Sequence, residues 1–208
     1  MVTDENFFMM NDTLKSIKER RSIRVFTKEE LPGEQIQILL QAANAAPSAH
    51  NQQSWKFIVL QGGKKNGLAE LVSEGASRFS RPAQALLRMS ARSIASAPVV
   101  IAVANSGDLI DHGTDLFSVE KDMAHDFFRT MEIQSSAAAV QNLLLAATSM
   151  GLATVWLGIM FLMKNEVLDF LGEPSDEFMA VVPVGHGSRT GGSGPKKQPV
   201  EMKVKYLD

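Results

Sequence analysis

The longest helical pattern in the chain, residues 124–150, limits the fold more than any other feature, because so long a helix needs other elements packed along it. Its middle, residues 135–139, reads Ser-Ser-Ala-Ala-Ala, and such small side chains let a second helix approach closely. Gly151 follows the pattern and is expected to end it. The stretch fits a central or interface helix and a simple buried helix equally well.

Four shorter segments have the character of β-strands. Residues 98–104 form a continuous apolar run, which is typical of a strand buried on both faces. Further strands are expected at 54–60, 153–157 and 180–184, where Pro183 indicates an edge or a strand end. Helices are expected at 13–21 (capped by Asp12 or Thr13), 31–46, 64–75, 81–93 and 164–171, and a loop at 106–114.

This order mixes helices and strands irregularly and lacks the steady alternation of a doubly wound fold. The chain has no G-x-G-x-x-G after a first strand and no Walker phosphate loop. The phosphate of any bound nucleotide would therefore have to be held by side chains.

Composition narrows the classes of protein. The 208 residues are 45% hydrophobic with a net charge of −2, which fits one globular domain and gives no reason to expect nucleic acid. Without cysteine, a disulfide, a thiol nucleophile and a zinc–thiolate site are excluded. The apolar run 97–104 is too short to cross a bilayer, and 137–147 is interrupted by Gln141 and Asn142. With no leader pattern at the start, we expect a soluble, cytoplasmic protein without membrane contact.

A basic cluster follows the first expected helix, where residues 19–26 read Glu-Arg-Arg-Ser-Ile-Arg-Val-Phe. A guanidinium is always charged, and its planar fork of donors suits a phosphate. The three guanidinium groups and one hydroxyl could hold a phosphate monoester. The other interpretation is a solvated helix end, where arginine favours the negative end of the dipole.

A polar loop separates the second expected helix from the first strand. Residues 46–55 read Ala-Pro-Ser-Ala-His-Asn-Gln-Gln-Ser-Trp, and seven of these ten side chains can form hydrogen bonds. Amide side chains offer both donors and acceptors, as reading the edge of a polar heterocycle requires. An ordinary polar loop that caps the helix is an equally good interpretation.

Two later segments add weaker signals. Residues 151–158 read Gly-Leu-Ala-Thr-Val-Trp-Leu-Gly, and the final glycine lets backbone approach a flat ligand or simply forms a tight turn. Residues 194–199 read Gly-Pro-Lys-Lys-Gln-Pro, where two lysines could complete a phosphate site or belong to a solvated tail.

Together and in this order, the four segments resemble the nitroreductase family of flavin mononucleotide (FMN) enzymes. Residues 20–26 look like its N-terminal phosphate motif, and residues 47–55 like its Pro-Ser-x-x-Asn-x-Gln-Pro-Trp loop, with Ser54 in place of proline. Residues 151–158 are similar to its Gly-Leu-Gly-Thr-x-Trp-Leu-Gly segment. Residues 182–185, followed by two lysines, resemble its final strand and basic tail.

The resemblance implies an α+β fold, in which helices wrap a mostly antiparallel sheet, and an intertwined homodimer with sites at its interface. Residues 1–12 would be an N-terminal extension. Residues 13–208 would be a single FMN-binding domain, with a C-terminal arm at about 186–208. The helix at 124–150 would lie at the centre of the dimer, and the alternating residues 200–207 could add a strand to the partner's sheet.

The resemblance also implies which residues contact the cofactor. One subunit would hold the flavin phosphate, and the other would place its polar loop against the isoalloxazine and ribityl groups. Backbone near Leu157 and Gly158 would face flavin N5 and O4. The phosphate residues would be Arg20, Arg21, Ser22 and Arg24, joined by Lys196 or Lys197, and the loop residues would be Pro47, Ser48, Ala49, His50, Asn51 and Gln53.

The chemistry would then belong to the flavin, with NADH or NADPH as reductant and a nitroaromatic, a quinone or a similar electron-poor small molecule as acceptor. Hydride would reach N5 and leave it in a ping-pong scheme, without a catalytic side chain and without a metal. His50 would be a loop contact.

Proteins with other functions could carry the same motifs. A specialised flavin relative, such as a deiodinase, an enoate reductase or a flavin-fragmenting enzyme, would use residues 106–128 as a lid. A non-enzymatic flavin-binding module would have the same loop and basic cluster. A metal hydrolase is disfavoured because His112, His125 and His186 lack H-E-x-x-H spacing.

Overall fold

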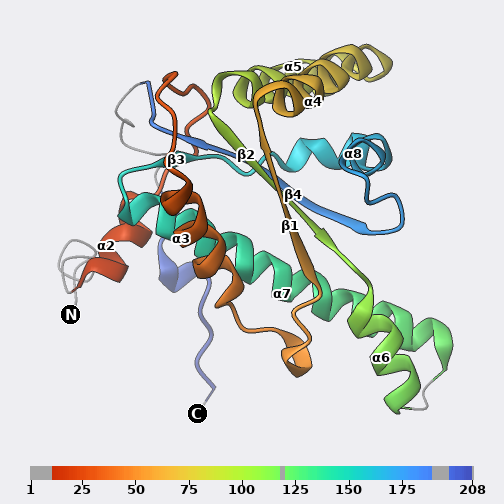
Figure 1. Ribbon diagram of the computed structural model, residues 1–208. Helices are drawn as coiled ribbons and strands as arrows, with labels where there is room; N and C mark the ends of the chain where they lie inside the picture. The colour runs from red at the N-terminus through yellow and green to blue at the C-terminus, as the bar shows by residue number, and fades with distance from the viewer. Residues whose placement is uncertain (1–10, 118–119, 189–196, 208) are drawn as a thin grey trace.

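The computed structural model describes residues 11–117, 120–188 and 197–207, and its centre is one antiparallel sheet (Figure 1). The strand order is β1-β2-β4-β3, where β1 is Trp55–Gln61, β2 is Val99–Asn105, β3 is Ala153–Thr154 and β4 is Glu177–Gly185. The register pairs Ile58 with Ala102 and Ile101 with Val182. A shift between Val103 and Ala104 marks an irregularity in the pairing of β2 with β4.

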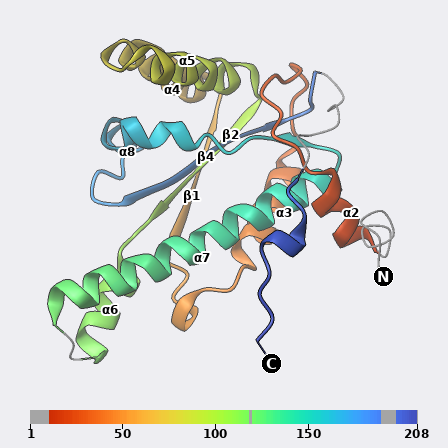
Figure 2. The same cartoon turned by 180° about the vertical axis from the view of Figure 1, so that it is seen from behind.

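Helices cover both faces of this sheet (Figures 1 and 2). One face carries α4, α5 and α8, and the other carries α3 and α7. The bounds are α2 (Asp12–Glu19), α3 (Gly33–Asn44), α4 (Gly62–Gly75), α5 (Arg81–Ser96), α6 (Asp108–Phe117), α7 (Lys121–Ser149) and α8 (Lys164–Leu171). Short 3-10 helices are η1 (Ala49–Asn51), η2 (Ala76–Arg78), η3 (Gly158–Met163) and η4 (Val200–Met202).

The central strand β2 divides the hydrophobic core into two layers. Val100, Ala102 and Ala104 pack with α4, α5 and η3, whereas Val99, Ile101 and Val103 pack with α3 and α7. This alternation follows from the two-residue period of a strand. Every residue of β2 is buried, which confirms the prediction of a strand covered on both faces.

The predicted α+β class is confirmed, and several elements appear where they are expected. The long helix α7 ends at Ser149, and Gly151 follows it in the left-handed conformation with φ of 74°. Helix α8 has the predicted bounds. Helix α2 is capped by Asn11, whose side chain accepts the Leu14 N–H at 3.0 Å, so the predicted cap at Asp12 or Thr13 was wrong by a residue or two.

The loop predicted at 106–114 was wrong, because residues 108–117 form helix α6. Its glycine reflects close packing: a Cβ on Gly113 would lie 2.4 Å from the Phe128 ring of α7. Leu109 is buried, and its N–H is bound by the Glu132 carboxylate at 2.8 Å, which satisfies one of the free donors of the first turn.

The remaining strand predictions have mixed outcomes. Pro183 was predicted at an edge or a strand end, and it lies two residues before the end of β4. β4 itself lies between β2 and β3, but β3 pairs only with Val184 and Gly185, so most of that side of β4 has no strand partner among the described residues. The strand expected at 153–157 is limited to Ala153–Thr154. Residues 200–207 form η4 and an exposed irregular stretch in this single chain, so the strand that they could add to a partner's sheet stays a prediction.

Within the described ranges, no helix has both the length and the apolar character that crossing a bilayer requires.

Candidate functional site

The basic cluster lies beside the segment that follows α7. After α2 the chain runs alongside β3, where the Ile23 N–H donates to the Thr154 carbonyl at 2.9 Å and Ser22 bridges Thr154 in parallel. A hollow of about 170 Å³ opens at this junction. Its lining residues are Arg20, Ser22, Gln141, Leu144, Thr154, Val155 and Trp156. The fold thus brings two of the four predicted segments, 20–24 and 151–158, into one pocket.

The three arginines of the cluster differ in their contacts. Arg20 lines the pocket and is half-buried. The Arg21 guanidinium donates to the backbone carbonyls of Lys18 and Arg20, at 2.5 and 2.8 Å. Arg24 is exposed and makes one long bond, 3.4 Å, to the Ser22 carbonyl. Because side chains alternate along an extended segment, Arg20 and Ser22 share a side that Arg21 does not.

Of the backbone N–H groups of Leu157 and Gly158, one already donates a hydrogen bond within the chain and the other is available to a ligand. The Leu157 N–H donates to the Val181 carbonyl at 3.0 Å. Gly158 is exposed and opens η3, and the first N–H groups of a helix have no acceptor within it. A Cβ built on Gly158 meets no atom of the described chain within 4 Å. Gly158 can therefore offer its N–H to a ligand that approaches closely.

The polar loop is strained. His50, Asn51 and Gln53 have φ of 53°, 54° and 54°, in the left-handed region that residues other than glycine seldom adopt. The turn is closed by bonds from the Asn51 N–H to the Ser48 carbonyl (3.0 Å) and from the Gln53 N–H to the Ser48 hydroxyl (3.1 Å). Such strain persists where surrounding structure enforces it, and it is concentrated at functional sites.

The loop and the pocket lie on different sides of α7. The Ala49 N–H donates to the Ser135 hydroxyl of α7 at 3.2 Å, whereas the pocket uses Gln141. The step from Ser135 to Gln141 corresponds to about 9 Å along the helix axis and about 120° around it. One chain therefore presents the two halves of the predicted site in different directions.

Comparison with known proteins identifies the family. Residues 17–186 match the model of the nitroreductase family. The chain belongs to the nitroreductase family. It is 30% identical over 150 residues to a putative NADH dehydrogenase/NAD(P)H nitroreductase of Archaeoglobus fulgidus, a match that covers 72% of this chain and 69% of that relative.

Solved structures agree with this assignment. A putative nitroreductase from Desulfovibrio desulfuricans in complex with FMN is 25% identical, with a TM-score of 0.71 over 95% of this chain and 98% of that one. An NADPH:FMN oxidoreductase from Vibrio harveyi complexed with NAD⁺ is 26% identical, with a TM-score of 0.71 over 95% of this chain and 79% of that one. The resemblance seen in the sequence motifs is thus confirmed at the level of family and fold.

Other predicted residues of this nitroreductase-family chain lie apart from the pocket. Pro47, Asn51 and Gln53 are exposed or partly exposed, and the Gln53 side chain donates to the Asn51 carbonyl at 3.0 Å. The exposed His50 ring meets the Phe117 ring edge-on, with centroids 5.6 Å apart. Lys197 is exposed on the C-terminal stretch, and Lys196 lies outside the described residues.

Sequence reasoning missed several pocket residues of this nitroreductase-family chain, of which Gln141 is the most informative. Gln141 is exposed on α7, and its amide can donate to a phosphate beside Arg20 and Ser22. Its signal in the sequence was the interruption of the apolar run 137–147, but only the fold shows that the interruption faces the basic cluster.

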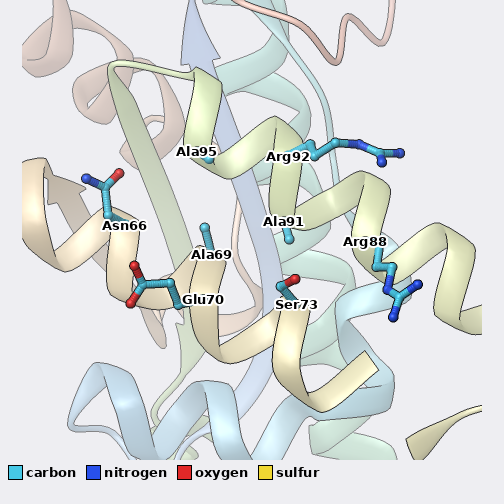
Figure 3. Close-up of a pocket in the computed structure, with 8 residues that line it drawn as sticks. All are labelled: Asn66, Ala69, Glu70, Ser73, Arg88, Ala91, Arg92 and Ala95. Carbon is cyan, nitrogen blue, oxygen red and sulfur yellow. The ribbon is translucent and has the colours of Figure 1, made fainter. Parts of the chain in front are cut away.

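A larger groove lies between α4 and α5 (Figure 3). It measures about 400 Å³, and its floor consists of Ala69, Ala91 and Ala95. Its two sides carry opposite charges, Glu70 on α4 against Arg88 and Arg92 on α5, and none of the predicted site residues line it. This groove is therefore separate from the candidate flavin site.

Proposed function

We propose that the protein is an FMN-dependent oxidoreductase of the nitroreductase type, which uses NADH or NADPH to reduce an electron-poor acceptor such as a nitroaromatic or a quinone. The observation that carries the proposal is the single pocket in which Arg20 and Ser22 meet the segment 154–156. The FMN and nicotinamide in the names of its relatives support the same cofactors here.

The pocket residues fit the phosphate end of FMN. Arg20 supplies a charge and a fork of donors, Ser22 a hydroxyl and Gln141 an amide N–H. At about 170 Å³ the pocket is smaller than the roughly 300–1,000 Å³ of a complete ligand site. The isoalloxazine must therefore be held mostly by other groups.

We propose that these other groups are the Gly158 N–H and the 47–53 loop of a second subunit. The loop's amides can meet the polar edge of the ring, and Gly158 leaves room for a flat ring to approach. When bound, FMN would supply the redox chemistry, which is hydride transfer from a nicotinamide to an acceptor in ping-pong order. The protein's part is to bind, orient and exclude water.

A homodimer is proposed for two further reasons. The outward face of α7 carries mostly small or amide side chains that are exposed or partly exposed, and α7 runs across the front of the molecule in Figure 2. The residues of this face are Gln134, Ala137, Ala138, Gln141, Leu145 and Thr148. The C-terminal stretch exposes Val200, Met202, Val204, Tyr206 and Leu207, an apolar set that a partner would cover.

The test measures FMN binding, turnover with different acceptors and the oligomeric state. Flavin-free protein is titrated with FMN, its flavin-loaded form is reduced anaerobically with NADH and with NADPH, and a quinone, a nitroarene, an enone and an iodotyrosine are then compared as acceptors. We expect about one FMN per chain, reduction by at least one nicotinamide, and a dimer in sedimentation. Protein that neither carries nor takes up FMN would contradict the proposal, and preferred turnover of the iodotyrosine would favour a deiodinase.

A further inference from the structure

The groove between α4 and α5 has the size of a small-molecule site. Its volume of about 400 Å³ lies within the roughly 300–1,000 Å³ of ligand pockets. Its lining runs from Asn66 to Ser73 on α4 and from Arg88 to Ala95 on α5, which corresponds to about 10 Å along each helix axis. With a width of roughly 8–10 Å between packed helices, this area is far below the about 800 Å² that each partner of a stable protein complex buries. The groove therefore suits a small molecule and not a protein.

The floor of the groove is apolar and fixed by the core. Ala69, Ala91 and Ala95 lie between Glu70 on one side and the two arginines on the other in Figure 3. Ala69 and Ala91 are buried. Beneath the floor, the two helices are anchored by four fully buried side chains: Leu68, Val72, Leu87 and Ile94. A ligand would therefore meet a preformed surface, and no ordering of the backbone would oppose its binding.

The charged groups on the two sides of the groove do not pair with each other. Figure 3 shows the carboxylate of Glu70 on one side of the alanine floor and the guanidinium groups of Arg88 and Arg92 on the other. Among the described residues, none of these three side chains forms an ion pair or a hydrogen bond. Nearby charges do pair where they reach each other, as Arg78 and Glu166 do at 2.6 Å. The groove thus holds separated charges of both signs, and both are available to a ligand.

The residue types indicate what each side can bind. Arg88 and Arg92 are one helical turn apart, so their guanidinium groups can meet on one anion. Together they match a phosphate monoester, whose charge is about −1.5 to −2 at pH 7. On the other side, the Glu70 carboxylate and the Asn66 amide oxygen are also one turn apart and can accept hydrogen bonds from an ammonium group.

We propose that this groove binds a small zwitterion, namely a phosphate monoester with an ammonium group at the other end of a short apolar segment. Arg88 and Arg92 hold the phosphate, Glu70 and Asn66 hold the ammonium group, and the alanine floor contacts the apolar segment. Helices α4 and α5 cover the face of the sheet opposite to α7, which carries the Gln141 of the candidate flavin pocket. The groove is therefore a second site, and it does not depend on the proposed flavin chemistry.

The decisive measurement is an amide NMR titration with 6-aminohexyl phosphate. We expect a dissociation constant on the order of 1 mM, which ligand-efficiency limits allow for about twelve non-hydrogen atoms, and shifts concentrated in α4 and α5. Hexyl phosphate lacks the ammonium group and hexylamine lacks the phosphate, so each should bind at least roughly threefold more weakly. Equal binding of hexyl phosphate would reveal only an anion-binding patch and would overturn the proposal. Absence of shifts in α4 and α5 at roughly twenty times the expected constant would overturn it as well.

Matched variants test the two charged sides. Arg92→Gln should weaken the binding of 6-aminohexyl phosphate roughly three- to tenfold, whereas Arg81→Gln, at an exposed position of α5 outside the groove, should change it less than about twofold. Glu70→Gln should reduce the affinity to that of hexyl phosphate, whereas Glu74→Gln, on an exposed part of α4 outside the groove, should not. Equal effects within either pair would show that only net charge matters and would overturn the proposal.

A third pair of variants tests the floor. Ala95→Leu would fill part of the groove from an exposed position, so it should weaken binding at least roughly threefold without lowering the thermal midpoint of unfolding. Ala85→Leu makes the same change at an exposed position of α5 outside the groove and should leave binding unchanged. Unchanged binding by Ala95→Leu would place the ligand elsewhere and would overturn the proposal.

Two controls separate this site from the candidate flavin pocket. The phosphate of the probe could also enter the pocket at Arg20, so the titration is repeated with Arg20→Ala, in which the shifts of α4 and α5 should persist. FMN-loaded protein should bind the probe as tightly as flavin-free protein does. Loss of the α4 and α5 shifts in either control would overturn the proposal. Failure of the protein to bind FMN would instead refute only the proposed function.

Discussion

Replacing Arg20 by alanine should weaken FMN binding far more than the same change at the next residue, Arg21. Arg20 lines the pocket beside Ser22 and Gln141, so its guanidinium can meet a phosphate. Arg21 donates to two backbone carbonyls of its own segment. The two variants remove the same charge from adjacent positions and therefore control for the loss of net charge.

The size of the difference follows from the bond that is lost. A hydrogen bond to a charged group contributes about 1.5–3 kcal/mol. At about 1.4 kcal/mol per tenfold change, Arg20→Ala should raise the FMN dissociation constant about 10- to 140-fold. Because Arg20 is only half-buried, salt screening places the effect nearer the lower limit at physiological ionic strength. Arg21→Ala should change the constant less than about threefold.

The assay is a titration of FMN with flavin-free protein, followed by flavin fluorescence at two salt concentrations. Riboflavin, which has no phosphate, serves as the internal control, since its affinity should not distinguish the two variants. Equal losses in Arg20→Ala and Arg21→Ala would show that only net charge matters. An unchanged affinity in Arg20→Ala would place the phosphate outside this pocket.

Three more substitutions test the surroundings of the site. Gly158→Ala should leave the thermal midpoint of unfolding unchanged, because no described atom lies within 4 Å of the new methyl group. The same substitution should weaken FMN binding roughly tenfold, because the methyl group would stand where the flavin ring approaches; equal FMN affinity would contradict this close approach. Gly113→Ala should destabilise the fold by about 1–3 kcal/mol, measured by denaturant unfolding, because its methyl group would overlap the Phe128 ring; unchanged stability would mean that α6 sits further from α7. Lys65→Met should lower the free energy of unfolding by about 1–2 kcal/mol, because the buried Lys65 ammonium donates to the Ala95 carbonyl at 2.7 Å. Because burial lowers the pKa of Lys65, the free energy of unfolding of the unsubstituted protein should rise relative to that of Lys65→Met as pH approaches 10.5, and parallel curves of unfolding free energy against pH would refute this.

The elements predicted correctly from the sequence were those whose signal lies within the element. Helix α8 and the long helix α7 follow from apolar periodicity, and β2 follows from a continuous apolar run. Helix α6 was missed because glycine and aspartate resemble a loop in a local reading. Gly113 serves a contact with Phe128, fifteen residues away in the sequence, which no local pattern encodes.

The residues of the candidate site also fall into those that the sequence indicates and those that only the structure reveals. The segments 20–24 and 151–158 were recognised by their residue types, and the fold brings them together through the bond between Ile23 and Thr154. Only the structure separates Arg20 from Arg21, because this depends on which side of an extended segment faces the pocket.

The position of α7 supports the proposal that two chains form a complete site. This helix supports the polar loop through Ser135 and the pocket through Gln141, on sides about 120° apart. To contact both in one chain, a flat flavin would have to bend around the helix, which supports the proposal that the loop serves the pocket of a second chain. If two copies meet along the outward face of α7, each loop is carried towards the other copy's pocket, and both sites are completed together. Flavin binding and dimer formation should then be thermodynamically linked, so that FMN raises the free energy of dimer dissociation by an amount that grows with the logarithm of its affinity. Sedimentation at several protein concentrations, with and without FMN, tests this linkage, and a dissociation constant of the dimer that FMN leaves unchanged would argue that each chain holds its flavin alone.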